Sequence, residues 1–211
     1  MIPVVGFATY SRFDLADRLV NSIDYPVEHL VVVDNSGKGA YQPPANPFVS
    51  NVWVLPIPFG LGLVGAWNLI VKSTPYAPYW VLVNDDAWFE PGALAVVEKE
   101  VDPDALNFLI CNPEWSCPVF GEGMIDKVGL YDERFYPLYF DDNDLERRVR
   151  LANVPVRKIN AVVHHDNSAS IKHEFNSLSF ARNQRLYNAK QDTDDRSWGW
   201  TLESRRANRW D

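Results

Sequence analysis

Short apolar runs alternate with amphipathic segments along the first half of the chain. Residues 3–8 (PVVGFA) and 29–34 (HLVVVD) have the length and composition of buried strands, and residues 12–23 between them carry apolar side chains at helical spacing. A strand, a helix and a second strand in this order favour a parallel pair of strands. The same alternation predicts two more strands, over 52–57 and 79–86, and two more helices, over 63–73 and 90–101. We therefore expect a doubly wound α/β sheet with helices on both faces.

The second half of the chain is less regular but contains elements of the same kinds. Leu145 and Val149 share one side of a predicted helix over 141–153, in which Asp144 and Arg148 are spaced to form an ion pair. Three further segments are predicted as a strand, a second strand and a helix, over 107–112, 154–166 and 177–190. A strand edge, a glycine turn and a short helix are expected within 117–135, and a single domain over residues 1–211.

The composition narrows the class of protein. The formal net charge of −8 disfavours nucleic acid as a partner, although the segment ESRRANRW near the end of the chain is locally basic. No apolar run approaches the roughly 20 residues of a membrane span. The first residues carry no cationic segment typical of a signal peptide, so a cytoplasmic protein is expected. The spacing of Cys111 and Cys117 fits no common zinc motif and indicates two reduced thiols.

A glycine-rich stretch raises the first functional hypothesis. In FGLGLVGAWN, Gly60, Gly62 and Gly65 spell the G-x-G-x-x-G pattern of dinucleotide-binding turns, and Asp85 follows Gly65 by twenty residues. Prolines separate the preceding strand from the glycines, and a complete strand–helix–strand unit comes before them. A dinucleotide-dependent oxidoreductase is therefore kept only as an alternative.

Acidic residues follow two of the predicted strands. Asp34 ends one strand, and Asn84, Asp85 and Asp86 end another. Ligands of open α/β sheets bind outside the carboxyl ends of the strands. Adjacent carboxylates repel one another unless a cation neutralises them, and oxygen ligands favour Mg²⁺ or Mn²⁺. We expect a divalent cation here, which would in turn hold a diphosphate.

Two more clusters carry possible chemistry. Three acids stand at the start of a predicted helix: Asp141, Asp142 and Asp144. Helix capping and the helix dipole explain one or two acids at such a position. A carboxylate there can also act as a general base. His164 and His165 end a strand, and since neighbouring strand residues point to opposite faces, at most one of them is expected at the site.

The order of these features resembles the GT-A fold glycosyltransferases, most closely the family-2, rhamnosyltransferase-like branch. Its V-I-P-T-Y-N-R, V-V-V-D-N-G-S and L-L-L-N-D-D segments are similar to VGFATYSR, LVVVDNSG and WVLVNDD in this chain. The family's glycine stretch, its E-D-x-D-L-x-x-R helix and its strand ending in His resemble PFGLGLVGAWNLIVK, DDNDLERR and VVHHDNSAS. The likeness covers roughly residues 3–170.

The resemblance implies a Rossmann-like, mixed and mostly parallel sheet and assigns roles to residues. By this resemblance, the nucleotide-sugar-binding half of the chain covers about residues 1–110 and the acceptor half about residues 111–175. A helix and a tail then cover residues 176–211. The residues implied for the nucleotide sugar are Thr9, Tyr10, Arg12, Asp34, Gly62, Asn68, Asn84 and Asp85. Those implied for the metal are Asp86 with His164 or His165, and those for the acceptor side are Gly121 and Met124. Asp142 matches the catalytic base; because this chain reads DDND, Asp141 is the alternative.

The implied activity is a metal-dependent transfer, with Mn²⁺ or Mg²⁺, of a sugar from a nucleoside-diphosphate sugar to an acceptor hydroxyl, with inversion at the anomeric carbon. The acceptor is left open between a polysaccharide, a protein and a modified DNA base. A non-catalytic nucleotide-sugar-binding protein of the same fold is the second alternative.

Overall fold

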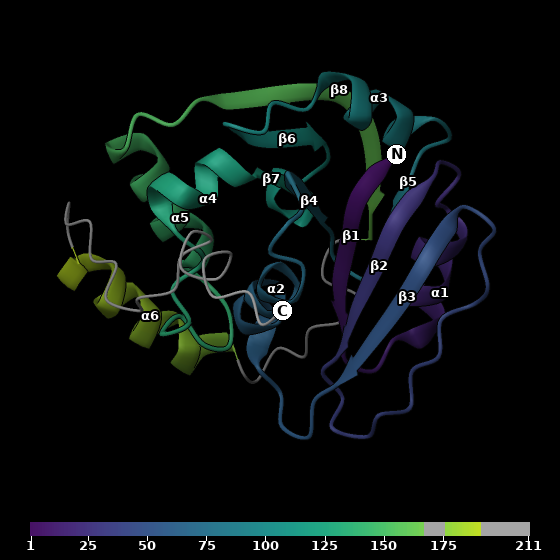
Figure 1. Ribbon diagram of the computed structural model, residues 1–211. Coiled ribbons are helices and arrows are strands. Elements are labelled where there is room, and N and C mark those ends of the chain that lie inside the picture. The colour runs from purple at the N-terminus through teal and green to yellow at the C-terminus, as the bar shows by residue number, and fades with distance from the viewer. Residues whose placement is uncertain (167–175, 191–211) are drawn as a thin grey trace, which may run out of the picture.

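Eight strands form one mixed sheet in the computed structural model, which describes residues 1–166 and 176–190 (Figure 1). Their order across the sheet is β3-β2-β1-β4-β7-β6-β8-β5. The strands are β1 (Ile2–Thr9), β2 (Val27–Asp34), β3 (Val49–Pro56), β4 (Tyr79–Leu82), β5 (Ala87–Phe89), β6 (Leu106–Ile110), β7 (Pro118–Gly121) and β8 (Val156–His165). Parallel pairing joins β3, β2, β1 and β4, and also β6 with β8, while β7 and β5 pair antiparallel with their neighbours. The expected mixed, mostly parallel α/β sheet is confirmed.

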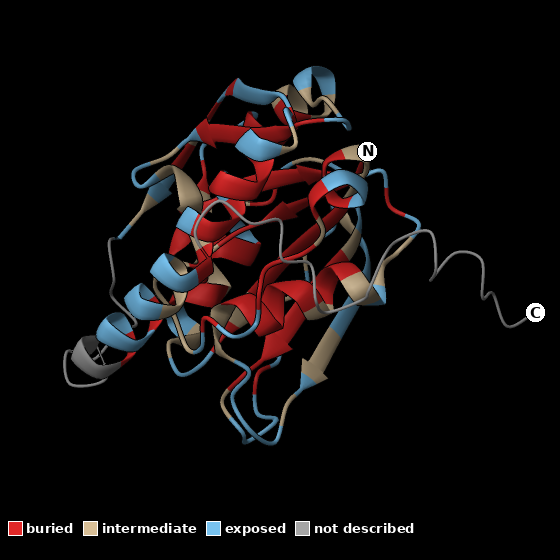
Figure 2. Cartoon of the chain, turned by 90° about the vertical axis from the view of Figure 1, so that its left-hand side faces the viewer, coloured by how far each residue is buried: buried red, intermediate tan, exposed pale blue. Residues whose placement is uncertain are grey.

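Helices cover both faces of this sheet. They are α1 (Phe13–Asn21), α2 (Gly62–Ser73), α3 (Ala93–Glu100), α4 (Glu122–Val128), α5 (Asp141–Leu151) and α6 (Asn176–Lys190), with a 3₁₀ turn over Glu114–Ser116. One apolar core joins α1 and α3 to one face, and a second joins α2, α4 and α5 to the other. Figure 2 shows the buried residues gathered in the central strands and the exposed ones on the outer sides of the helices. The alternation of apolar runs and amphipathic segments therefore predicted the layers correctly.

The parallel strands end together at one edge of the sheet, which we call the carboxyl edge. Thr9 lies opposite Asp34 in the β1–β2 register, and the backbone N–H of Asn35 donates to the carbonyl of Thr9 at 2.8 Å. On the other side of β1, the N–H of Val83 donates to the carbonyl of Gly6. The ends of β1, β2 and β4 are thereby brought close together, as expected.

Two boundaries differ from the sequence prediction. β4 ends at Leu82, and a turn closed by a hydrogen bond from the Ala87 N–H to the Asn84 carbonyl separates it from β5. The turn carries the acids out of the strand, so 79–86 is not one continuous strand. The helix predicted over 90–101 begins only at Ala93, after Gly92 at φ 82°, which leaves Pro91 outside it.

Helix α2 packs closely on β1 because of a glycine in the strand. A Cβ at Gly6 would lie 2.5 Å from Cγ2 of Ile70, whereas a Cβ at Gly65 would meet only Cβ of Leu61, at 3.1 Å. The close approach of α2 to the sheet therefore depends on Gly6 of the strand and not on Gly65 of the helix.

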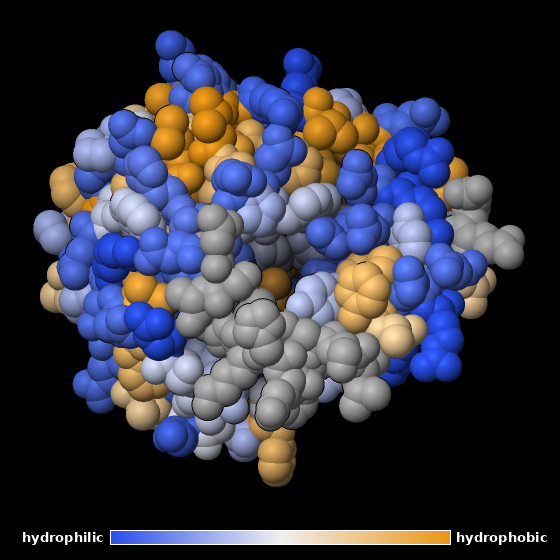
Figure 3. Space-filling model, turned by 180° about the vertical axis from the view of Figure 1, so that it is seen from behind, coloured by the Kyte–Doolittle hydropathy of each residue, from blue (hydrophilic) through white to orange (hydrophobic). Residues whose placement is uncertain are grey.

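The surface away from these cores is largely polar. Figure 3 shows the rear of the molecule, where hydrophilic side chains make up much of the rim around a central hollow. Within residues 1–166 and 176–190, no helix combines the length and the apolar character that a membrane crossing demands.

Candidate active site

The glycine stretch forms a loop held against the end of β2. Oδ1 of Asn35 accepts the N–H of Leu61 at 2.7 Å, and Nδ2 of Asn35 donates to the carbonyl of Gly62 at 3.4 Å. Gly62 has φ 70°, and a Cβ there would lie 2.9 Å from the carbonyl oxygen of Pro137. Glycine is thus required at position 62 by the backbone conformation and by the segment that packs on it.

Asp34 is the last residue of β2 and is fully buried. One carboxylate oxygen accepts the N–H of Ser36 at 3.0 Å and the other accepts the N–H of Tyr41 at 3.1 Å. Burial opposes ionisation, but the hydrogen bonds around the carboxylate outweigh it and lower the pKa of Asp34. The residue is therefore an ionised acceptor at the carboxyl edge that also shapes the loop after β2.

Three residues at the end of β1 differ in what they offer a ligand. Thr9 is 1% exposed, and its hydroxyl oxygen has no hydrogen-bond partner within the described residues. Tyr10 is exposed, and the guanidinium of Arg12 forms a two-point pair with Asp14 at 2.7 and 2.9 Å. Thr9 is thus the one of the three that places a buried, unsatisfied polar atom at the carboxyl edge.

The turn after β4 brings an acid into contact with a histidine from β8. Oδ1 of Asp86 lies 2.9 Å from Nε2 of His165, and both side chains are 5% exposed. The amide nitrogen of Asn84 lies 3.4 Å from the same ring nitrogen. Asp85 is also buried at this turn. The structure therefore gathers Asn84, Asp86 and His165 at one point.

His164 does not join them. It pairs across the strand with Trp88 and stacks on its ring at 5.1 Å between centroids, with its Nε2 3.8 Å from Glu90. The side chain is 46% exposed. Since successive strand residues face opposite sides, His165 turns inward and His164 turns out, so His165, and not His164, lies beside Asp86.

The Asp86–His165 pair fits a hard divalent cation in part. Ligands at about 2.1 Å that are adjacent in an octahedron lie about 3 Å from each other, which matches the 2.9 Å separation. The described residues contain no group of three His, Cys, Asp or Glu side chains placed to hold a metal ion.

A cavity of about 260 Å³ opens beside this pair. Asn84 is among the residues that line it, together with Asp141 and Asp142 at the start of α5. Aromatic side chains make much of its wall, among them Trp67, Trp115 and Tyr131. Asn84 thus contacts His165 of the Asp86–His165 pair and also lines the cavity that Asp141 and Asp142 line.

The two acids differ in their surroundings. Asp141 is 8% exposed; burial, helped by the neighbouring charge of Asp142, raises its pKa to about 7. Asp142 is half-buried, and its Oδ1 accepts the N–H of Asn143 at 2.8 Å. Asp142 is therefore the carboxylate more open to a bound molecule, and Asp141 is a buried group that titrates near neutrality.

The third acid of the cluster is structural. Asp144 is fully buried and binds Arg148 at 2.9 Å, Arg147 at 3.3 Å and Lys190 of α6 at 2.6 Å. The Asp144–Arg148 pair expected from the spacing is confirmed, but it is buried and lies in a larger network. Lys190 also reaches Asp132 at 2.8 Å.

Helix α6 fixes the segment that leads into α5. Tyr139 and Phe140, just before the acids, have φ of 78° and 66°, an unfavourable conformation for such residues. Nδ2 of the fully buried Asn183 donates to the carbonyls of Leu138 and Tyr139 at 2.9 and 3.2 Å. Neither this contact nor that of Asn35 could be predicted from the sequence, because each of these amides binds the backbone of a distant segment.

Three residues that the family resemblance assigns to the site either lie away from the cavity or already have hydrogen-bond partners within the protein. Asn68 is buried, and its amide binds both backbone groups of Tyr131 and the carboxylate of Glu133. Gly121 pairs with Tyr79, the first residue of β4, so it lies at the edge opposite to Asp86. Met124 is fully buried in the core. Neither Gly121 nor Met124 therefore lies at the carboxyl edge, because β7 runs antiparallel to β4 and ends at the opposite edge of the sheet.

Comparison with solved structures identifies the fold. The S. aureus TarS structure has a TM-score of 0.58 at 13% identity and covers 90% of this chain, and TarS 1-349 in complex with UDP-GlcNAc scores 0.60 at 13% identity with the same coverage. GalNAc-T7 with UDP, GalNAc and Mn²⁺ scores 0.61 at 8% identity over 78% of this chain. The chain spans 39% of the TarS chain, 66% of TarS 1-349 and 44% of GalNAc-T7.

These neighbours are glycosyltransferases of the GT-A type, and at such identities they establish the fold alone. No protein-family model and no curated protein matches the sequence. Assignment to the rhamnosyltransferase-like branch stays a prediction.

Proposed function

We propose that this protein is an inverting glycosyltransferase that moves a sugar from a nucleoside-diphosphate sugar to an acceptor hydroxyl. The observation that carries the proposal is the position of Asn84. It lies 3.4 Å from His165 in the Asp86–His165 pair and lines the cavity that Asp141 and Asp142 face. The Asp86–His165 pair, which suits a cation that binds the donor's diphosphate, thus lies next to the carboxylates of Asp141 and Asp142. A sugar transfer needs both, because the donor and the acceptor must bind side by side.

The donor would lie along the carboxyl edge. Thr9 and Asp34 offer polar groups to its nucleoside there, and Asp86 with His165 would hold a Mn²⁺ or Mg²⁺ ion near its diphosphate. That ion would stabilise the negative charge that develops on the leaving diphosphate. The solved neighbours bound to UDP-GlcNAc, or to UDP with Mn²⁺, support this choice of ligand.

Asp142 would act as the base. Its carboxylate accepts the proton of the acceptor hydroxyl as that oxygen bonds to the anomeric carbon and the bond from this carbon to the phosphate oxygen breaks. One displacement from the opposite face inverts the anomeric centre and leaves the proton on Asp142. We choose Asp142 over Asp141 because it is the less buried of the two and matches the base of the resembling family.

The test begins with UDP, dTDP and GDP sugars in thermal-shift measurements with and without Mn²⁺, followed by turnover of the donor that binds. We expect Asp142→Asn to lower turnover by about 10²–10⁴-fold while donor binding persists. Glu146→Gln, an exposed position on the same helix, is the matched control and should keep full turnover. Full turnover in Asp142→Asn would refute the assignment of the base.

The same measurements separate the alternatives. Donor binding without turnover in the unaltered protein would identify a binding protein, and a thermal shift with nicotinamide dinucleotides alone would identify an oxidoreductase. Gly62, the second glycine of the dinucleotide pattern, packs against the carbonyl oxygen of Pro137, which lies 2.9 Å from where a Cβ would be.

A further inference from the structure

One continuous part of the chain carries no charge. Residues 39–71 contain no Asp, Glu, Lys, Arg or His, in a chain of which 23% is charged. This uncharged segment holds β3, the glycine loop and most of α2. Several large apolar side chains on it are exposed, including Phe48 at 42%, Val52 at 46% and Trp53 at 54%.

Strand β3 forms an edge of the sheet. In the described part of the chain it pairs with β2 alone (Figure 1). Its residues from Ser50 to Trp53 are all exposed. Proteins usually protect such an edge with charged side chains, because the unpaired backbone groups of a long edge strand bind other strands. The eight residues of β3 include no charged one.

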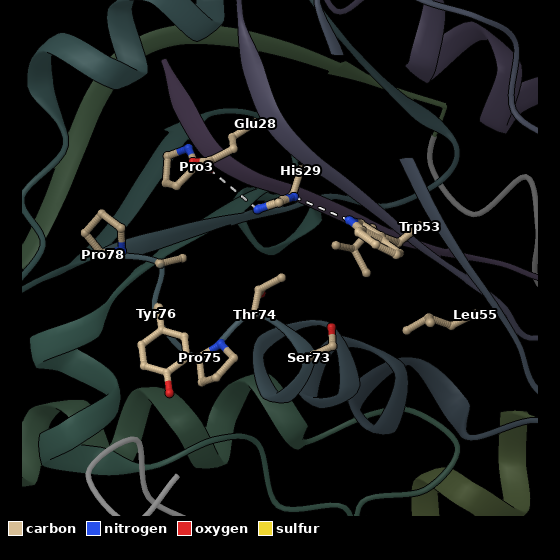
Figure 4. Close-up of a pocket in the computed structure, with 12 residues that line it drawn as sticks. Pro3, Glu28, His29, Trp53, Leu55, Ser73, Thr74, Pro75, Tyr76 and Pro78 are labelled. Carbon is tan, nitrogen blue, oxygen red and sulfur yellow. Dashed lines mark hydrogen bonds and ion pairs between the residues drawn. The ribbon is translucent and has the colours of Figure 1, made fainter. Parts of the chain in front are cut away.

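An apolar cavity of about 470 Å³ adjoins this edge. Trp53 and Leu55 of β3 line one side, and Pro75 and Tyr76, after α2, line another (Figure 4). The indole nitrogen of Trp53 lies 3.4 Å from Nδ1 of His29 on β2. The unpaired backbone, the exposed apolar side chains and the cavity thus form one continuous surface.

A second copy of this chain fits that surface. In a symmetric dimer the same patch meets itself, so any charge on it would face a like charge. Because the chain has a net charge of −8, other surfaces of two copies would repel each other. The uncharged edge of β3 can meet its own copy without this repulsion. Depletion of charge and exposure of Trp and Phe are also typical of the centre of protein interfaces.

We propose that β3 pairs antiparallel with β3 of a second copy and so joins the two sheets, with the partner's β3 side chains covering the cavity beside Trp53. A two-fold axis perpendicular to the sheet keeps each side chain on its face, so one residue of β3 must lie opposite its own copy. The residues of the candidate active site lie outside β3, and the proposal does not depend on the proposed function.

The first experiment is light scattering coupled to size exclusion, or analytical ultracentrifugation, on the full chain. We expect a mass twice 24.1 kDa. Val52→Lys should give the monomer, whereas Val156→Lys, at a similarly exposed apolar position on β8 (54%), should leave the dimer intact. A monomeric unaltered protein, or a dimer that survives Val52→Lys, would overturn the proposal.

The second experiment tests the pairing directly. Single cysteines are placed from Ser50 to Val54 in a background with Cys111→Ser and Cys117→Ala, confirmed as folded by its melting curve. A disulfide needs Cα atoms within about 7 Å, which only the residue on the axis meets, since its neighbours lie about 8 Å from their own copies. We expect cross-linking that peaks at one position; equal cross-linking at all of them, or none, contradicts antiparallel pairing.

Discussion

Asp86 and His165 meet at 2.9 Å although one belongs to a turn and the other ends a long strand. Their neighbours explain the contact: Ala87 pairs with His165 between β5 and β8, and the N–H of Asp166 donates to the carbonyl of Asp86. Arg18 on α1 reaches the same carbonyl at 3.3 Å and binds Asp166 at 2.7 Å. The pair is thus positioned by backbone pairing and by a helix on the face of the sheet.

The two adjacent histidines should therefore behave differently. If His165 holds the proposed cation, His165→Ala should weaken the Mn²⁺-dependent binding of a nucleotide sugar by about 10-fold or more. His164→Ala removes only an exposed ring stacked on Trp88 and should bind as the unaltered protein does. Metal titrations followed by thermal shift measure both, with ligand-free melting curves as the control for folding. Equal losses in the two variants would contradict the assignment of His165.

Asp141 should make the stability of the protein depend on pH. Its pKa is raised from 3.8 to about 7 in the folded protein, so the folded state holds a proton there that the unfolded state has released between these values. Stability therefore falls as pH rises from about 4 to about 7, by at most about 4 kcal/mol. Asp141→Asn should flatten this decline, and urea unfolding at pH 5 and pH 8 measures it. If the variant loses the same stability between the two pH values as the unaltered protein, the raised pKa is wrong.

The strands of the parallel half could be predicted because each is a short apolar run separated from the next by a helical pattern. The convergence of Asp34 with Asn84, Asp85 and Asp86 followed from that topology, since parallel strands end at the same edge. The choice between His164 and His165 could not be made in advance. It depends on which face of β8 turns inward, and the pairing with β5 fixes that.

Contacts between distant segments could not be predicted from the sequence for a different reason. Asn183 and Lys190 lie on a helix whose sequence predicted no role, yet they bind the segment before α5 and two buried acids. Gly121 was placed at the acceptor side by its motif, but the antiparallel direction of β7 carries it to the other edge. A sequence motif fixes neither strand direction nor the partner of a polar side chain.

Lys190 should be important for stability. It is 5% exposed and bridges Asp132 and Asp144, so Lys190→Met leaves two buried carboxylates with fewer partners. We expect a loss of about 3–5 kcal/mol, or a melting temperature lower by roughly 6–20 °C. Lys158→Met, which breaks only the exposed pair with Glu114, should cost less than about 1 kcal/mol.

The pH dependence of the Lys190 variant provides a second check. Although burial opposes ionisation of Asp132, hydrogen bonds from Arg134 and Lys190 lower its pKa to about 2. A lowered pKa stabilises the folded state above the ordinary value near 3.8, and this contribution is lost as pH falls toward 2. The stability gap between the unaltered protein and Lys190→Met should therefore narrow from pH 7 to pH 3. A gap that stays constant over this range would show that the ion pairs are not its cause.

The packing of α2 against the sheet yields a matched pair of glycine variants. Gly6→Ala places a methyl group 2.5 Å from Ile70, and the dense core can accommodate it only by moving the helix. We expect a loss of about 1–3 kcal/mol and a melting temperature lower by roughly 2–12 °C. Gly65→Ala meets only the side chain of Leu61, at 3.1 Å, and gains about 1 kcal/mol of helix propensity, so its melting temperature should be unchanged or higher. Thermal unfolding of the two variants side by side decides the point: if Gly65→Ala proves the more damaging, the close approach of α2 to the sheet lies at the helix glycine and not at β1.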